Sequence, residues 1–196
     1  VDRAKHWLVE LHVDAVIIGE GELTLYEYLT QPELPKIHGL LYTNENNEVC
    51  FNGPRKMLFD LDSMPFPALD KIPLHKYNAP IKKSSPVSSI STSRGCPEKC
   101  TFCYSREGVW RQRSPKNVVD EIEWQVNTLG VRELWITDDN FTLNRKRSMD
   151  IAQMIIDRKI NVKLQLKNGI RADKVDRELL AKLKDAGLWF LSVAPE

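Results

Sequence analysis

The sequence predicts an α/β fold in which a parallel sheet lies against an outer layer of helices, either doubly wound or closing toward a barrel. From residue 87 onward, short apolar runs of strand length alternate with longer runs of helical periodicity. Polar or charged residues follow each of these strands, and three of the four cysteines follow the first. Because the carboxyl ends of parallel strands meet at one edge of a sheet, these side chains are expected to form a single site.

The overall composition is that of an ordinary globular protein. Of the 196 residues, 42% are hydrophobic and 28% are charged, which excludes a disordered chain. The 28 Lys and Arg residues nearly balance the 27 Asp and Glu residues, and the net charge of +1 argues against a generally basic nucleic-acid-binding protein. The longest apolar runs have four residues, far fewer than the roughly 20 that a membrane-spanning helix needs.

The first predicted element is a buried strand at residues 13–18. The turn Gly19-Glu-Gly-Glu22 leads from it into a helix with Leu25, Tyr26 and Leu29 on one face. This order of elements indicates one βα unit of a parallel sheet.

A hairpin and a proline-rich passage follow. Residues 38–43 and 48–51 flank a run of asparagine-rich turn residues, which predicts a hairpin. Cys50 is interpreted as a half-buried strand cysteine. Residues 61–86 are interpreted as an extended linker, because closely spaced prolines exclude regular helix and central strand there; they are Pro65, Pro67, Pro73, Pro80 and Pro86.

The remaining chain is predicted to contain four strands, at residues 87–92, 134–137, 162–166 and 188–193. The helices between them are expected to open at Ser114-Pro115, to span 145–159 and to be capped by Asp173. The residues that follow the four strands are Cys96, Cys100 and Cys103, then Asp138, Asp139 and Asn140, then Asn168 and Arg171, and last Glu196.

The three clustered cysteines predict a metal or cluster site in a reducing compartment. An odd number of cysteines in a chain of this length argues against a disulfide framework. A structural zinc site needs four ligands, and no further Cys or His lies near the cluster in the sequence. Three thiolates suit a [4Fe–4S] cluster with one open iron, although zinc or incidental thiols stay open at this point. Arg94 and Lys99 are expected to lower the pKa of these thiols. A helix is expected directly after the cysteines, and its backbone N–H groups should lower the pKa further.

The segment Ser93-Arg-Gly-Cys96-Pro-Glu-Lys-Cys100-Thr-Phe-Cys103 resembles the signature loop of the radical S-adenosylmethionine (SAM) enzymes, Cys-x₃-Cys-x-aromatic-Cys. Other pieces resemble the cobalamin-binding subgroup of that superfamily, and they occur in the same order along nearly the whole chain. They are Gly19, Glu20, Gly21 and Glu22, the stretch 61–68, the stretch 138–141 and the stretch 168–171. The cysteine motif is specific to the superfamily, whereas the other pieces are persuasive through their order.

The resemblance implies that Cys96, Cys100 and Cys103 bind three irons of a [4Fe–4S] cluster and that SAM chelates the fourth. Reduction of the cluster would cleave SAM to methionine and a 5′-deoxyadenosyl radical, which abstracts hydrogen from a small-molecule substrate. No catalytic residue is expected beyond this cluster and SAM site. Candidate SAM contacts are Phe102, Asp138, Asp139, Asn140, Arg171 and Glu196. Packing of Phe102 under the loop, an N-cap role for an aspartate and a solvated Arg171 stay open as alternatives.

The resemblance also implies the domain organisation. Residues 1–60 would be the C-terminal part of a Rossmann-like, cobalamin-binding-like α/β domain, 61–86 a Pro-rich linker, and 87–196 the first half of a radical SAM partial TIM barrel with about four βα units. The Asp-x-His-x-x-Gly motif that supplies a cobalamin ligand in relatives does not occur in the sequence. Cobalamin is therefore expected only in a longer, full-length protein, of which this chain would be a part, with residues 19–22 on the cobalamin side.

The expected activity is cobalamin-dependent methyl transfer, or a related cyclisation or rearrangement, in the cytoplasm. An electron donor such as flavodoxin or ferredoxin is the expected protein partner, and nucleic acid is not. Two alternatives stay open: a cobalamin-free radical SAM enzyme that modifies RNA, and a non-catalytic module that binds zinc or an iron–sulfur cluster.

Overall fold

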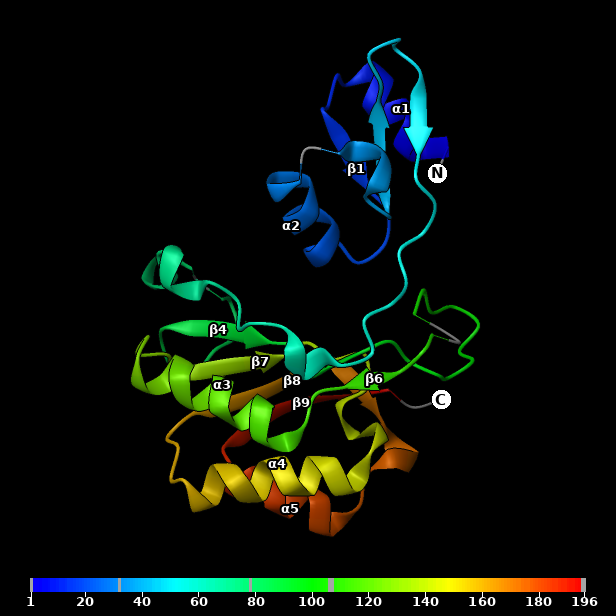
Figure 1. The fold of residues 1–196 in the computed structure, drawn as a ribbon. Helices are drawn as coiled ribbons and strands as arrows, with labels where there is room; N and C mark the ends of the chain where they lie inside the picture. Colours follow the sequence, from blue (N-terminus) through cyan, green and yellow to red (C-terminus); the bar gives the residue numbers. More distant parts are fainter. Residues whose placement is uncertain (1, 32, 78, 106–107, 195–196) are drawn as a thin grey trace. The chain divides into compact units, whose positions relative to one another are not determined.

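The computed structural model of the chain describes residues 2–31, 33–77, 79–105 and 108–194. The chain divides into two compact units, Val1–Leu58 and Phe59–Glu196 (Figure 1). No helix within the described ranges has both the length and the apolar character needed to cross a membrane.

The first unit contains a three-stranded antiparallel sheet in the order β1-β2-β3. Its elements are α1 (Asp2–Glu10), β1 (Ala15–Ile17), α2 (Glu22–Thr30), the 3₁₀ turn η1 (Leu34–Lys36), β2 (Leu40–Thr43) and β3 (Val49–Phe51). The predicted strand, helix and hairpin are all present, but the predicted parallel pairing is wrong for the described strands. The hairpin lays β2 antiparallel to β1, with Val16 opposite Leu41, and the Ile18 N–H donates to the Gly39 carbonyl at 2.8 Å.

Helix α2 does not bury its apolar face within this unit. Leu25, Tyr26 and Leu29 are 47%, 65% and 71% exposed. The buried contact of α2 is instead Thr24, whose hydroxyl donates to the His38 carbonyl at 2.9 Å.

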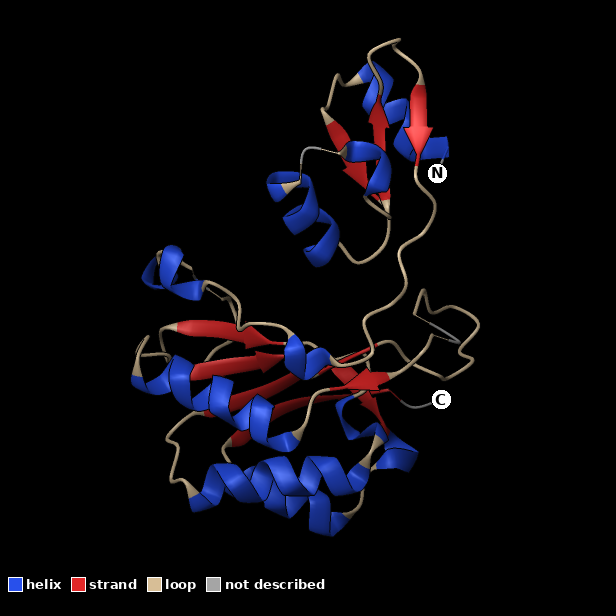
Figure 2. Ribbon diagram, viewed as in Figure 1, coloured by secondary structure: helices blue, strands red, loops and turns tan. Residues whose placement is uncertain are grey.

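The second unit is built on a parallel four-stranded sheet in the order β4-β7-β8-β9. Its strands are β4 (Val87–Ile90), β7 (Glu133–Ile136), β8 (Lys163–Arg171) and β9 (Leu188–Ala194). Helices α3 (Pro115–Asn127), α4 (Arg145–Asp157) and α5 (Arg177–Asp185) connect these strands and cover one face of the sheet (Figure 2). The predicted α/β repeat is therefore confirmed in this unit.

The core lies between the sheet and these helices. Leu134 and Ile136 of β7, like Leu164 and Leu166 of β8, are buried in it, because alternate residues of a strand face the same side. Their helical partners include Ile122, Ile151, Ile155, Leu179 and Leu183. The side chains between them, such as Trp135 and Gln165, therefore face the other side of the sheet.

The proline-rich stretch 61–86 belongs to the second unit and packs on it. It has no regular helix or strand among its described residues, as predicted, but forms three single 3₁₀ turns, η2 (Leu61–Ser63), η3 (Leu69–Lys71) and η4 (Leu74–Lys76). The Phe66 ring lies 6.0 Å from the Trp124 ring of α3. At the far end, the buried Glu133 carboxylate accepts hydrogen bonds at 2.7 Å from the backbone N–H groups of Lys83 and Ser84.

Two predicted boundaries in this unit are wrong. Strand β8 does not end at Leu166 but continues through Asn168 and Gly169, because an irregularity in its pairing with β9 lets the ladder resume at Ile170. The N-cap of α5 is Asp176, which accepts from the Leu179 N–H at 2.8 Å. Asp173 lies in the preceding turn η6 (Ala172–Lys174).

Candidate SAM and cluster site

The three clustered cysteines lie on a loop that is closed at its base. Strands β5 (Ser93–Arg94) and β6 (Arg111–Gln112) pair antiparallel and form the two legs of this loop, here called the Cys loop. Inside it, the Gly108 N–H donates to the Cys96 carbonyl at 2.7 Å, and the Cys103 N–H donates to the Cys100 carbonyl at 3.0 Å. All three thiols are free of disulfide bonds.

Gly95 makes the narrow base of the Cys loop possible. Its φ is +80°, in the left-handed region that favours glycine. A Cβ at this position would lie 2.4 Å from the Val109 carbonyl oxygen on the opposite leg. The glycine before Cys96 therefore allows the two legs to approach each other closely.

A pocket of about 330 Å³ lies between the Cys loop and the ends of two parallel strands. Its lining residues are Cys96, Glu98, Cys100, Phe102 and Cys103 of the loop, Asp139 and Asn140 after β7, and Asn168, Gly169, Ile170 and Arg171 of β8. The sequence prediction that residues after successive strands meet at one edge is thus borne out for the first three strands.

The three polar residues after β7 have different surroundings. Asp138 is buried and points away from the pocket: its carboxylate accepts from the Thr92 N–H and the Ser93 hydroxyl, both at 2.6 Å. Asp139 is exposed, lines the pocket and accepts from the Ser105 hydroxyl at 3.2 Å. Asn140 is buried in the pocket wall, and its Nδ2 has no hydrogen-bond partner within the described structure.

The alternative that one of these aspartates caps the following helix is wrong. Helix α4 is capped by Asn144, whose Oδ1 accepts from the Arg147 N–H at 3.0 Å.

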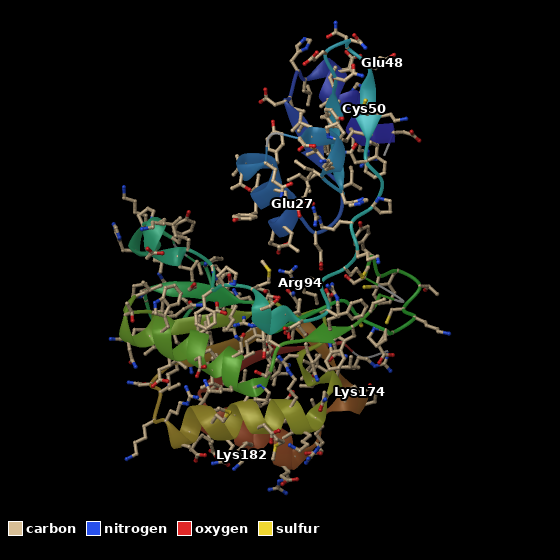
Figure 3. The ribbon with its side chains drawn as sticks, viewed as in Figure 1. Glu27, Glu48, Cys50, Arg94, Lys174 and Lys182 are labelled. Carbon is tan, nitrogen blue, oxygen red and sulfur yellow. The ribbon has the colours of Figure 1, made fainter. Side chains whose placement is uncertain are left out.

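Arg171 lies at the pocket but already has anionic partners. Its Nε is 2.8 Å from Asp173 Oδ1, and its Nη1 is 3.3 Å from Glu98 Oε2 on the Cys loop. Lys174, labelled in Figure 3, is 4.0 Å from the other Glu98 oxygen. These ion pairs join the Cys loop to the end of β8, and neither Glu98 nor Lys174 was predicted as part of the site.

The electrostatics of Cys96 differ from the prediction. Burial raises the pKa of the Cys96 thiol, and the nearby Glu98 and Asp139 carboxylates raise it further, although a backbone hydrogen bond from Glu98 opposes them. The predicted lowering by Arg94, Lys99 and a following helix is therefore wrong for Cys96. Among the described residues after Cys103, the first regular element is the strand β6, and α3 begins only at Pro115.

The other predicted residues fall into three groups. Phe102 is 84% exposed, which excludes the alternative that it packs under the loop. Glu196 lies outside the described residues. Gly19, Glu20, Gly21 and Glu22 belong to the first unit, as does Cys50, which is half-buried on β3 as predicted (Figure 3).

The donor set suits an iron–sulfur cluster, because three thiols line one pocket. Across the described ranges, no three His, Cys, Asp or Glu side chains gather closely enough to hold one ion. In a [4Fe–4S] cluster with one open iron, each of three cysteines binds a different iron. The three thiols line one pocket, and the unpartnered Asn140 Nδ2 adds a donor for a ligand beside them.

Comparisons with known proteins agree with this chemistry. Residues 90–196 match the radical SAM superfamily. An uncharacterized methyltransferase of Pyrococcus horikoshii is 39% identical over 150 residues, covering 73% of this chain and 32% of that protein. The anaerobic magnesium-protoporphyrin IX monomethyl ester cyclase of Synechocystis is 29% identical over 187 residues, covering 91% of this chain and 36% of that protein.

A solved structure shares the fold. The radical SAM methyltransferase TsrM from Kitasatospora setae, with cobalamin and a [4Fe–4S] cluster bound, superposes with a TM-score of 0.67 at 17% identity, covering 96% of this chain and 39% of that one. The chain spans about a third of the length of the two curated relatives. The chain belongs to the radical SAM superfamily.

Proposed function

We propose that this chain supplies the cluster- and SAM-binding part of a cobalamin-dependent radical SAM enzyme that performs methyl transfer or a related cyclisation or rearrangement. The observation that supports this most directly is the placement of all three cysteines in one pocket with the polar ends of β7 and β8. When bound there, a reduced [4Fe–4S] cluster supplies the electron that cleaves SAM reductively.

The chain's own residues would bind and orient these groups. Cys96, Cys100 and Cys103 would each bind one iron, leaving the fourth iron for SAM. The exposed Asp139 carboxylate suits the SAM ammonium group as an acceptor, and the unpartnered Asn140 Nδ2 suits a SAM oxygen as a donor. Phe102, exposed at the pocket, offers an aromatic face to the adenine ring.

Two of the predicted SAM contacts, Asp138 and Arg171, are less favoured because their side chains already have partners. The Asp138 carboxylate is occupied by the base of the Cys loop. Arg171 is paired with Asp173 and Glu98, so a SAM carboxylate would have to compete with these two groups.

Cobalamin, substrate and electron donor belong to the same proposal for the whole protein. TsrM was solved with cobalamin and a [4Fe–4S] cluster bound. Cytidylyl-2-hydroxyethylphosphonate methyltransferase of Streptomyces wedmorensis is 26% identical over 226 residues, covering 98% of this chain and 42% of that protein. Because the methyltransferase and the cyclase act on unlike molecules, the proposal names the substrate only as a small molecule. The proposed electron donor is a one-electron donor of the flavodoxin or ferredoxin kind. Residues 19–22 stay the candidate residues on the cobalamin side.

The test is anaerobic reconstitution with iron and sulfide, followed by electron paramagnetic resonance of the reduced protein with and without SAM. We expect a cubane-type signal that shifts when SAM is added. Cys100→Ala should lose iron and the signal, whereas the control Cys50→Ala, in the other unit, should keep both. A folded protein that binds zinc, or a cluster signal that ignores SAM, would favour a non-catalytic module instead. Cobalamin retention by the full-length protein tests the subgroup separately.

A further inference from the structure

A buried Asp and a buried Arg lie directly beneath the Cys loop. Asp138, after β7, is 3% exposed, and Arg147, on α4, is 4% exposed. Burial lowers the pKa of the Arg147 guanidinium, and the charge of Asp138 opposes this shift. Buried charges cost free energy unless their hydrogen bonds are well satisfied, so the partners of this pair show what it does.

Asp138 binds the first leg of the Cys loop through three hydrogen bonds. Its Oδ1 accepts from the Thr92 N–H at 2.6 Å, and its Oδ2 accepts from the Thr92 hydroxyl at 2.5 Å and from the Ser93 hydroxyl at 2.6 Å. Thr92 is fully buried and Ser93 nearly so, which keeps water from competing for these bonds. The carboxylate thus ties the residues just before Cys96 to the end of β7.

Arg147 joins both legs of the loop to helix α4. Its Nη2 donates to the Thr92 carbonyl at 2.6 Å, just before the first leg. Its Nε donates to the Arg113 carbonyl at 2.8 Å, just after the second leg. The Arg113 N–H in turn donates to the same Thr92 carbonyl at 3.0 Å. One planar guanidinium therefore fixes the spacing of the two legs, which a single-point cation such as lysine does not reproduce.

We propose that Asp138 and Arg147 are positioning residues that clamp the base of the Cys loop, so that the three thiols are held over the ends of β7 and β8 before any cofactor binds. The value of the clamp for the cluster rests on the proposed function, but the clamp itself is a property of the apoprotein. It also separates the roles of neighbours in the sequence: Asp138 holds the loop, while Asp139 and Asn140 face the pocket.

The test measures hydrogen exchange of the loop-base amides, residues 92–96 and 108–113, in the cofactor-free chain by mass spectrometry. Asp138→Ala should speed their exchange at least about tenfold, since loss of one charge-assisted hydrogen bond suffices for that factor. Arg147→Lys keeps the positive charge but loses the planar pair of donors, and it should also speed exchange of the loop-base amides. Exchange in the middle of α3 should stay unchanged. Asp157→Asn, at the exposed end of α4, is the matched control and should leave the loop base unaltered.

A milder variant keeps the test valid if Asp138→Ala does not fold. Ser93→Ala removes one donor to Asp138 and leaves both charged side chains in place, so it should raise loop-base exchange by a smaller factor. After reconstitution, the clamp variants should bind less iron and show a weaker SAM-induced change in the cluster signal. Rescue of that signal by Asp138→Asn, which retains an acceptor for the Thr92 N–H, would show that geometry matters more than charge.

The outcomes separate the two proposals. If folded Asp138→Ala and Arg147→Lys exchange their loop-base amides at the wild-type rate, the clamp is refuted, whatever the cluster does. If loop-base exchange rises but the wild-type chain binds no iron, the clamp stands and the proposed function fails. Faster exchange throughout the second unit, including α3, would refute a local clamp and show a general loss of stability.

Discussion

Gly95→Ala tests whether stability and iron binding depend on the close approach of the two legs of the Cys loop. Two costs are expected at this position. The φ of +80° costs an alanine about 1 kcal/mol or slightly more. The new Cβ would also lie 2.4 Å from the Val109 oxygen, so the legs must part by at least 0.6 Å to reach the 3.0 Å below which real Cβ contacts essentially do not occur.

That separation acts on the hydrogen bonds at the loop base. The bond from the Gly108 N–H to the Cys96 carbonyl and the pairing of β5 with β6 both depend on the spacing of the legs. With about 1 kcal/mol for each hydrogen bond weakened, the total destabilisation should be about 2–4 kcal/mol. Gly130→Ala is the matched control, because Gly130 has a φ of +71° in the same unit but no atom within 4 Å of the position that the alanine methyl group would take. It should cost only the conformational term of about 1 kcal/mol.

The assay is urea unfolding followed by tryptophan fluorescence. In a Trp7→Phe background, the remaining tryptophans all belong to the second unit and report on it alone. Gly95→Ala should unfold at clearly lower urea than Gly130→Ala and should also bind less iron on reconstitution. Equal unfolding midpoints for the two variants would falsify the steric reasoning and leave backbone conformation as the whole effect.

Three further predictions concern the second unit. Glu133→Ala should destabilise it by about 2–4 kcal/mol in urea unfolding, because two partly buried backbone N–H groups and the buried Gln165 amide lose their acceptor, and Glu133→Gln should cost less. The Arg145 hydrogen bond holds the pKa of Asp176 below its ordinary value of 3.8, so this carboxylate stabilises the fold above that pH and the contribution is lost as pH falls through the lowered pKa. Asp176→Asn, which still caps α5, should therefore flatten the fall of the urea midpoint between about pH 5 and pH 2, and an unchanged slope would contradict this. Phe102→Ala should leave stability within about 0.5 kcal/mol because the ring is exposed, yet weaken SAM binding in a titration of the reconstituted protein; unaltered SAM binding would remove Phe102 from the site.

The elements of the second unit were predictable because their sequence signals are local. Ser114 caps α3 with its hydroxyl 3.1 Å from the Asn117 N–H, and Pro115 follows as the first helical residue, as the pair predicts. The alternation of Leu134 with Trp135 and of Leu164 with Gln165 likewise gives strand positions that face the helices. In the first unit the same local signals gave the elements but not the pairing of β1, because strand direction depends on which neighbour a strand meets and not on its own residues.

The meeting of the cysteines with the residues after β7 and β8 was predictable from topology, since parallel strands end at a common edge. The ion pairs of Glu98 with Arg171 and Lys174 were not, because they join residues more than 70 positions apart whose side chains could equally face solvent. Arg147 was hidden for another reason. On an amphipathic helix an arginine is ordinarily a solvated residue, and only the loop carbonyls placed above it make burial tolerable.

The different roles of Asp138, Asp139 and Asn140 could not be predicted from the sequence. After β7 ends, three consecutive polar side chains point in different directions: the first into the base of the Cys loop, the second onto the exposed lip of the pocket, and the third into its wall. Any of the three fits the role of a SAM contact by residue type alone. A substitution survey would mislead here, because loss of activity in an Asp138 variant reflects a displaced loop rather than a lost SAM contact. Loop-base hydrogen exchange in the apoprotein distinguishes the two causes, since only Asp138 among the three should alter it.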